Sequence, residues 1–251
     1  MKFFVPLRAQ FFLRQIMTNE LLLIGSVIFI FGSVPLAFKF FGKTGLYCMS
    51  VVATILANIE VSILVNAFGM EQTLGNVLFA VTFLATDILS ECEGKKAANK
   101  SVALGIFATL FYLAISQSWG LFIPSQNDLV QGHFKVIFSA APRIVIASLV
   151  SYAISQFFDV WLYHKWWALT EKHFADKRRF LWLRNNGSTL ISQIVNTISF
   201  NLCAFAGVYN TGTLISIVVS SYLIYVVTSL LDTPVVYIAR RIHENKVKKS
   251  A

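Results

Sequence analysis

Residues 82–96 read TFLATDILSECEGKK and follow the apolar run 74–81 without a break. Asp87 therefore falls near the end of a membrane-length segment, which then runs into Glu91 and Glu93. A charge at the centre of a bilayer costs roughly 3 kcal/mol or more, so a carboxylate kept inside such a segment predicts a functional role for Asp87. We expect Glu93 to pair with the lysines that follow it, whereas Glu91 fits either role.

The composition indicates a membrane protein. Of the 251 residues, 56% are hydrophobic and only 13% are charged, and the mean hydropathy is +0.67. A soluble domain would have a charged fraction of about 25%. The apolar residues come in blocks of about 20, which is the length that spans a hydrocarbon core. The sequence therefore predicts an all-α polytopic membrane protein, a bundle of six to seven transmembrane helices.

Seven segments have the required length, namely residues 21–38, 46–68, 74–89, 102–123, 136–163, 188–208 and 213–239. They divide the chain into a basic, amphipathic N-terminal segment (1–20), a single transmembrane domain (21–241) and a basic tail (242–251). The last span is expected to break at Asp232–Thr233–Pro234, because proline removes a backbone donor. The longest loop is expected at 164–187.

The distribution of charge predicts the topology. Most of the 21 Lys and Arg residues fall on one side of the seven-span arrangement, in the loops after the first, third and fifth spans and in the tail. Basic residues stay in the cytoplasm, so the C-terminus is predicted to be cytoplasmic. Whether 21–38 crosses stays open, because the segment before it is also basic. The net charge of +9 then reflects cytoplasmic loops, and no nucleic-acid partner is expected.

Cysteine and histidine indicate no metal site, disulfide or cofactor. Cys48, Cys92 and Cys203 are isolated, and the four histidines lie in predicted loops and tails. No histidine falls inside a span and no nucleophile has a base beside it, so enzymatic activity is not expected. No phosphate-binding loop is present in the sequence, so a transporter would draw its energy from an ion gradient or from a separate protein.

The span 188–208 is unusually polar. Gln193, Asn196 and Thr197 are three and four residues apart, so they share one helical face. The two amides fit a ligand site and also fit hydrogen bonds between helices. We expect residues 184–186 to form a turn before this span, with Asn186 and Ser188 as capping residues.

Four further polar residues are candidates for the same site. Asn58 and Glu60 lie in the middle of the span 46–68, with no basic residue within one turn. Arg143 lies near the start of its span and fits either a site or a side chain that extends to the interface. Asp159 lies near the end of that span and fits either a site or an ion pair with the loop that follows.

Long stretches of the chain resemble the queuosine precursor transporter family, also called the vitamin uptake transporter family. These stretches are LANIEV (56–61), NAFG (66–69), GNVLFAVTFLATDILSECEGKKAA (75–98), PRIVIASLVSYAISQFFDVWLY (142–163), LWLRNNGSTLISQIVNTISF (181–200) and YLIYVVTSLLDTPVVYIARR (222–241). The resemblance implies a six-helix core, with 21–38 as the extra N-terminal helix of some members. Many members carry aspartate where this chain has Asn196.

The resemblance implies import of a 7-deazaguanine precursor of queuosine across a bacterial cytoplasmic membrane, for tRNA modification. A guanine-like edge has two N–H donors for a carboxylate and a carbonyl for an amide or Arg, and aromatic rings stack on its face. We therefore expect substrate binding by Asn58, Glu60, Asp87, Arg143, Gln193 and Asn196, and coupling or gating by Glu91, Asp159 and Asp232. The alternative is a substrate-binding subunit of an energy-coupling factor transporter with a separate ATPase module. A homo-oligomer also stays open.

Overall fold

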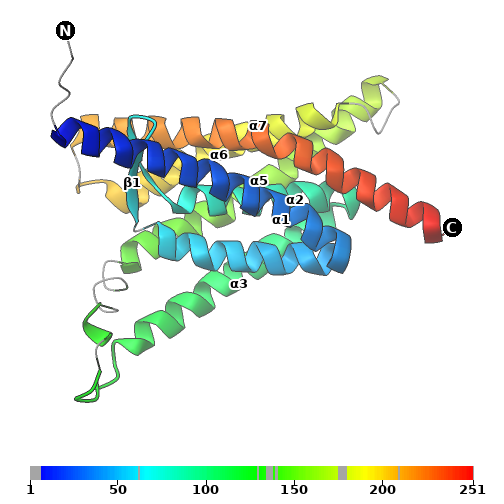
Figure 1. Cartoon of the computed structure of the whole chain (residues 1–251). Coiled ribbons are helices and arrows are strands. Elements are labelled where there is room, and N and C mark those ends of the chain that lie inside the picture. The colour runs from blue at the N-terminus through cyan, green and yellow to red at the C-terminus, as the bar shows by residue number, and fades with distance from the viewer. Residues whose placement is uncertain are drawn as a thin grey trace, which may run out of the picture.

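A computed structural model describes residues 7–61, 63–128, 130–133, 138, 141–174, 180–208 and 210–250. Its elements are α1 (Leu7–Glu60), β1 (Leu64–Ala67), β2 (Met70–Thr73), α2 (Gly75–Cys92), α3 (Lys95–Trp119), α5 (Ala141–Phe174), α6 (Leu181–Phe205) and α7 (Thr211–Ser250). The helices form one elongated bundle (Figure 1). The prediction of an all-α polytopic membrane protein is confirmed, with a small β-hairpin added.

The helix α1 folds back on itself and contributes two legs to the bundle. The fold is at Gly42, whose φ of 62° and ψ of −146° lie outside the helical region. A positive φ is accessible to glycine because it has no Cβ. Gly45 follows so closely on the first leg that a Cβ there would overlap the carbonyl of Ala37. The predicted spans 21–38 and 46–68 are therefore separate legs, joined by a tight turn (Figure 1).

The second predicted span was placed too far along the chain. The α1 helix ends at Glu60, and residues 64–73 form an antiparallel hairpin in which Leu64 pairs with Thr73. Its turn is Phe68–Gly69, and both residues have positive φ, 54° and 72°. Two-residue hairpin turns favour this conformation because it matches the twist of the strands.

The hairpin marks one end of the bundle, which we call the hairpin end. Asn19 Nδ2 donates to the Asn66 carbonyl at 3.1 Å, and Glu20 Oε1 accepts from the Phe68 amide at 2.8 Å. The start of α1 is thereby fixed beside the hairpin. The opposite end, which we call the basic end, has the turn of α1 at Gly42, the connection between α2 and α3, and the end of α7.

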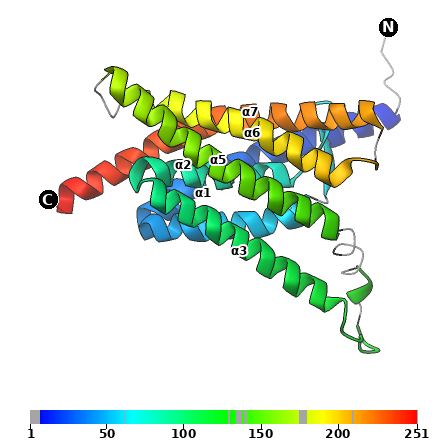
Figure 2. The ribbon, with the colours of Figure 1, turned by 180° about the vertical axis from the view of Figure 1, so that it is seen from behind.

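The central helix of the bundle is α2, which packs against α1, α3, α5 and α7. Every residue from 80 to 90 is buried. Because each face of α2 meets another helix, both its apolar residues and its few polar ones are buried. Figure 2, seen from behind, shows α5 and α6 crossing the side of the bundle that faces away in Figure 1. The helix α3 diverges from the bundle toward the loop that follows it.

Among the described residues, 5 helices are long and apolar enough to span a membrane, and α6 is not one of them. With 25 residues α6 still has the necessary length, about 37 Å at 1.5 Å per residue. Its polar residues are tolerated because they are buried against α5 and α7. Counting both legs of α1, the bundle has the seven membrane-length segments that the sequence predicts.

Two local predictions for the last helices were wrong. The helix α6 begins at Leu181, so Asn186 and Ser188 lie within it rather than capping it. The helix α7 continues through Asp232 and Pro234 to Ser250 without the predicted break. Proline removes only its own amide donor, a loss that membrane helices tolerate when neighbouring helices pack around them, so Pro234 does not end α7.

The loop before α6 is also shorter than predicted. The helix α5 extends to Phe174 and α6 begins at Leu181, so most of the expected loop 164–187 is helical. The predicted start of the fifth span at residue 136 lies outside the described residues. The basic tail 242–251 is helical as far as Ser250, as a continuation of α7.

Candidate functional site

Buried polar side chains run through the centre of the bundle from the hairpin end toward the basic end. We call this set the polar column, and its residues come from α2, α5, α6 and α7. They are Thr82, Thr86, Asp87, Ser155, Gln156, Asp159, Asn185, Ser188, Thr189, Ser192, Gln193, Asn196, Ser229 and Asp232, all of them buried. A spacing of three and four residues along α6 directs its side chains in this set to one face of that helix.

Two aspartates meet at the middle of the column. Asp87 of α2 and Asp159 of α5 are fully buried, and their carboxyl groups are in side-chain contact. Thr189 Oγ1 donates to Asp87 Oδ2 at 3.1 Å, and Ser192 Oγ donates to Asp159 Oδ1 at 2.8 Å. The helix α6 thus supplies one hydroxyl donor to each carboxyl group. In the described part of the chain no ion pair reaches Asp159; the loop residues 175–179, where the sequence allows a basic partner, lie outside that part.

A third carboxyl group, from α7, lies close to this pair. Asp232 is buried and interacts electrostatically with both Asp87 and Asp159. Asn185 Nδ2 donates to Asp232 Oδ1 at 2.8 Å. The residues predicted as a turn before α6 therefore contribute to the column, with Asn186 Nδ2 donating to Thr233 Oγ1 at 2.7 Å.

An ion-pair cluster closes the column toward the basic end. The side chain of Glu91 is 3% exposed and accepts from Arg184 Nη2 at 2.9 and 3.0 Å and from the Tyr163 hydroxyl at 2.7 Å. Arg240 Nη1 lies 3.2 Å from Glu91 Oε1, and the Arg184 guanidinium lies 4.5 Å from the ring centroid of Trp167. We call these five residues the Glu91 cluster.

Glu93, only two residues further along, is in a different environment. It lies 3.7 Å from Lys43 in a partly exposed pair, with the lysine side chain 58% exposed. The sequence predicts an ion pair of Glu93 with the lysines that follow it, but the described pair is with Lys43, at the turn of α1. Glu91 is thus a carboxylate within the bundle, whereas Glu93 lies at its surface.

Between the aspartates and the hairpin end, amide side chains connect the helices. Gln156 Nε2 donates to Thr82 Oγ1 at 2.6 Å and Gln156 Oε1 accepts from Thr86 Oγ1 at 3.2 Å, which links α5 to α2. Asn196 Nδ2 donates to Gln193 Oε1 at 3.2 Å along α6. Gln193 and Asn196 share a buried face, as their spacing predicts.

The column reaches a small cavity at the hairpin end, with a volume of about 40 Å³. We call it the aromatic pocket and define it by Asn76, Phe79, Asn196, Phe200 and Tyr225, which line it. The Tyr225 hydroxyl donates to Asn76 Oδ1 at 3.1 Å, and the rings of Phe79 and Tyr225 are 6.1 Å apart. Both aromatic surface and amide groups thus face one space.

Most of the aromatic pocket was missed in the sequence. Of its five residues, only Asn196 was a candidate from the spacing of polar groups. Asn76 has the same signal as Asn58, an amide inside an apolar segment. Phe79 and Tyr225 gave no signal, because aromatic residues are abundant throughout the chain, with 23 Phe in total.

Three of the predicted substrate residues lie apart from the column. Glu60 is the last residue of α1 rather than mid-span, and Asn58 Nδ2 donates to the Thr54 carbonyl at 2.8 Å. Arg143 is exposed, and its guanidinium donates to the carbonyls of Cys203 at 2.9 Å and Ala206 at 2.6 Å. Arg143 thereby satisfies free carbonyls at the end of α6, which a helix terminus requires.

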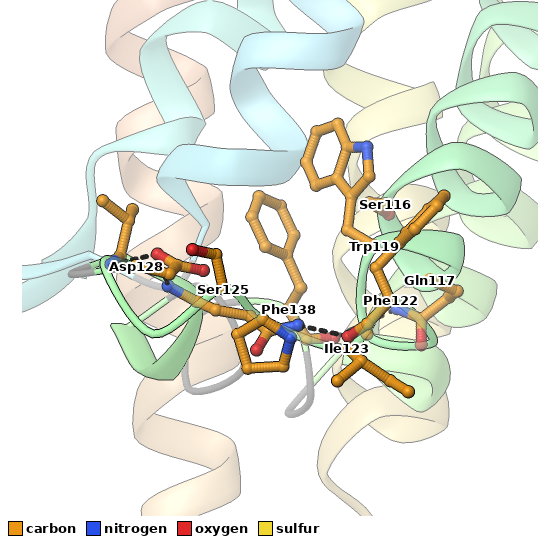
Figure 3. A pocket seen from close by; sticks show the side chains of 12 residues that line it. Ser116, Gln117, Trp119, Phe122, Ile123, Ser125, Asp128 and Phe138 are labelled. Carbon is orange, nitrogen blue, oxygen red and sulfur yellow. Dashed lines mark hydrogen bonds between the residues drawn. The ribbon is translucent and has the colours of Figure 1, made fainter.

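A second cavity, of about 640 Å³, lies where α3 meets the following loop. Its walls include Trp119, Phe122, Ile123 and Phe138, which Figure 3 shows around one hollow. Asp128 accepts from the backbone amide of Val130 at 2.7 Å and so serves the loop itself. None of the predicted site residues lines this cavity, and the column remains the candidate site.

Comparison with known proteins identifies the family of the chain. A family model described as "Putative vitamin uptake transporter" matches residues 73–239. The chain belongs to this vitamin uptake transporter family. The matched region runs from the end of β2 to residue 239 within α7 and contains every residue of the polar column. The resemblance seen in the sequence is confirmed.

Two curated members of the family are similar to the chain over much of its length. A protein of Bacillus subtilis (strain 168), named "Probable queuosine precursor transporter", is 37% identical over 217 residues, which cover 86% of this chain and 93% of that protein. The "Queuosine precursor transporter" of Escherichia coli (strain K12) is 28% identical over 158 residues, 59% of this chain and 62% of that protein. No solved structure matches the chain.

Proposed function

We propose that this protein imports a queuosine precursor, a 7-deazaguanine base, across the bacterial cytoplasmic membrane. The observation that carries the proposal is the 37% identity, over 86% of the chain, to a relative named for this transport. The polar column supports it, because polar and ionisable groups inside a membrane bundle mark substrate or ion pathways. Such a carrier uses the column as its path.

The aromatic pocket is the proposed entry site for the base. Phe79, Phe200 and Tyr225 supply faces for stacking, and Asn76 and Asn196 supply amides that match the edge of a guanine-like ring. At about 40 Å³ the cavity holds little more than a water molecule, so the base enters only when the helices around it separate. The conformation described is therefore a closed one.

The orientation follows from the charges at the two ends. The basic end carries the lysines and arginines of the turn in α1, the start of α3 and the end of α7. The positive-inside rule assigns this end to the cytoplasm, together with the C-terminus. The aromatic pocket then lies on the outer side of the bundle, and the Glu91 cluster is the closed cytoplasmic gate.

The proposal is tested in cells that cannot synthesise queuosine precursors. The chain is expressed, 7-cyano-7-deazaguanine, its aminomethyl analogue or queuine is supplied at nanomolar concentration, and queuosine in tRNA is measured. Modification that appears only with the chain supports the proposal, and the strongest response identifies the substrate. No modification by any base, with the protein present in the membrane, would refute it.

A further inference from the structure

The contact between Asp87 and Asp159 lacks donors. Each carboxyl group receives one close hydroxyl hydrogen bond, from Thr189 and Ser192, and the hydroxyls of Ser188 and Thr189 also face Asp159. The remaining oxygens, Asp87 Oδ1 and Asp159 Oδ2, are buried and have no hydrogen-bond donor among the described residues. A hydrogen bond between two carboxyl groups requires one proton, because two carboxylates are both acceptors.

Among the described residues, no ion pair joins a cationic side chain to either aspartate. The charged and titratable groups around it are Asp232 on α7, Glu91 on α2 and Tyr163 on α5. The arginine of α6, Arg184, is bound to Glu91. In the described parts of α1 and α3, no ion pair reaches either aspartate. Two ionised carboxylates in contact, away from water, would repel strongly.

A further buried acceptor lies on the residue that binds the third carboxyl group. Asn185 is fully buried and directs its amide at Asp232, yet its own Oδ1 has no donor among the described residues. Unsatisfied buried acceptors are uncommon in native proteins, and each calls for a donor. The missing group at this site is therefore a hydrogen donor rather than another acceptor.

We propose that the Asp87–Asp159 pair binds one proton for each base transported, and so couples import to the proton gradient. This inference rests on the proposed function. An O–H bond forms on one of the two carboxyl groups from the outer side and breaks toward the cytoplasm, with no other covalent change. Proton relays built from aspartate side chains are a known use of ionisable groups within membranes.

The geometry links this proton to the cytoplasmic gate. Asp87 and Glu91 are four residues apart on α2, and Asp159 and Tyr163 are four residues apart on α5. Residues at this spacing are neighbours on a helix, so the pair lies one turn from the bond between Tyr163 and Glu91. Release of the proton makes α2 and α5 repel each other at the turn next to the gate.

The test uses the purified full chain in proteoliposomes with radiolabelled 7-cyano-7-deazaguanine. Exchange of labelled for unlabelled base, without any gradient, first establishes transport. A pH gradient of about one unit, acid on the side of the added base, is then expected to raise accumulation about tenfold at one proton per base. A pH dye inside the vesicles should report proton entry only when base is added.

Variants and ions separate the alternatives. Asp159→Asn should abolish accumulation driven by the pH gradient, whereas the surface variant Glu93→Gln should keep the tenfold response. The wild-type measurement decides the question if Asp159→Asn fails to fold. Exchange without any response to pH, or accumulation driven by a sodium gradient instead, would overturn proton coupling and leave the transport function standing. No exchange with any of the three bases would overturn both.

Discussion

Replacing Arg184 with methionine should destabilise the folded protein by about 3–5 kcal/mol, the cost of breaking a buried ion pair. Arg184 is fully buried and makes two bonds to Glu91, of 2.9 and 3.0 Å. A hydrogen bond between charged groups contributes about 1.5–3 kcal/mol, and a desolvated cation–π contact with Trp167 about 2 kcal/mol. Arg240 and Tyr163 still contact Glu91 in the variant, so the loss should fall at the lower end of the range.

The change is measured by equilibrium unfolding in detergent micelles, with helix content followed by circular dichroism. Lys43→Met is the matched control, because it breaks an exposed pair with Glu93 that is worth about 0–1 kcal/mol. Adding Glu91→Gln to Arg184→Met should cost less than the sum of the two single changes, since the pair is removed together. A loss below about 1 kcal/mol for Arg184→Met, or additive losses, would refute a buried ion-pair cluster.

Three other predictions concern the column, the pocket and the packing. Asp87→Asn should abolish uptake while the protein remains folded and in the membrane, and normal uptake would remove Asp87 from the site. Tyr225→Phe removes the hydrogen bond to Asn76 and should raise the apparent KM for uptake about 3- to 10-fold, because a hydrogen bond contributes about 1 kcal/mol net. An unchanged KM would exclude a role of Tyr225 in base binding. Gly105→Ala places a Cβ against the buried Tyr152 hydroxyl and should lower the free energy of unfolding by about 1–3 kcal/mol. A Cβ at Gly25 meets nothing within 4 Å, so the control Gly25→Ala should not lower the melting temperature. Equal melting temperatures for the two variants would contradict this packing.

The membrane architecture could be predicted from the sequence because it depends on local properties. Blocks of apolar residues give the spans, and the positions of polar residues within them give the faces that become buried. Gln193 and Asn196 share such a face, and Asp87 lies within the most buried helix. Neither result requires knowledge of which helices are neighbours.

The errors occurred where distant residues decide the local structure. Arg184 and Asn185 were predicted to lie in a turn, since polar residues before an apolar segment are typical of turns. Their partners Glu91 and Asp232 are 93 and 47 residues away, so the sequence does not show that these side chains are buried and paired. The first strand of the hairpin, at residues 64–67, was assigned to a helix, since a short apolar run fits a buried strand and a buried helix equally well. The meeting of Asp87 with Asp159 depends on how α2 packs against α5, which no spacing along the chain reveals.

The polarity of α6 has a consequence for how the protein is made. Among the described helices α6 is one that composition alone does not mark as membrane-spanning, and its face carries Arg184, Gln193 and Asn196. Such a segment partitions poorly into lipid by itself, because each polar group adds to the cost of insertion. The preceding helix α5, which packs closely along it, is apolar enough to enter first and shelter it. Because the chain is made from the N-terminus, Asp87 enters the membrane before Thr189 is synthesised. The hydrogen bonds of the polar column therefore form only when α6 inserts beside helices that are already in the bilayer.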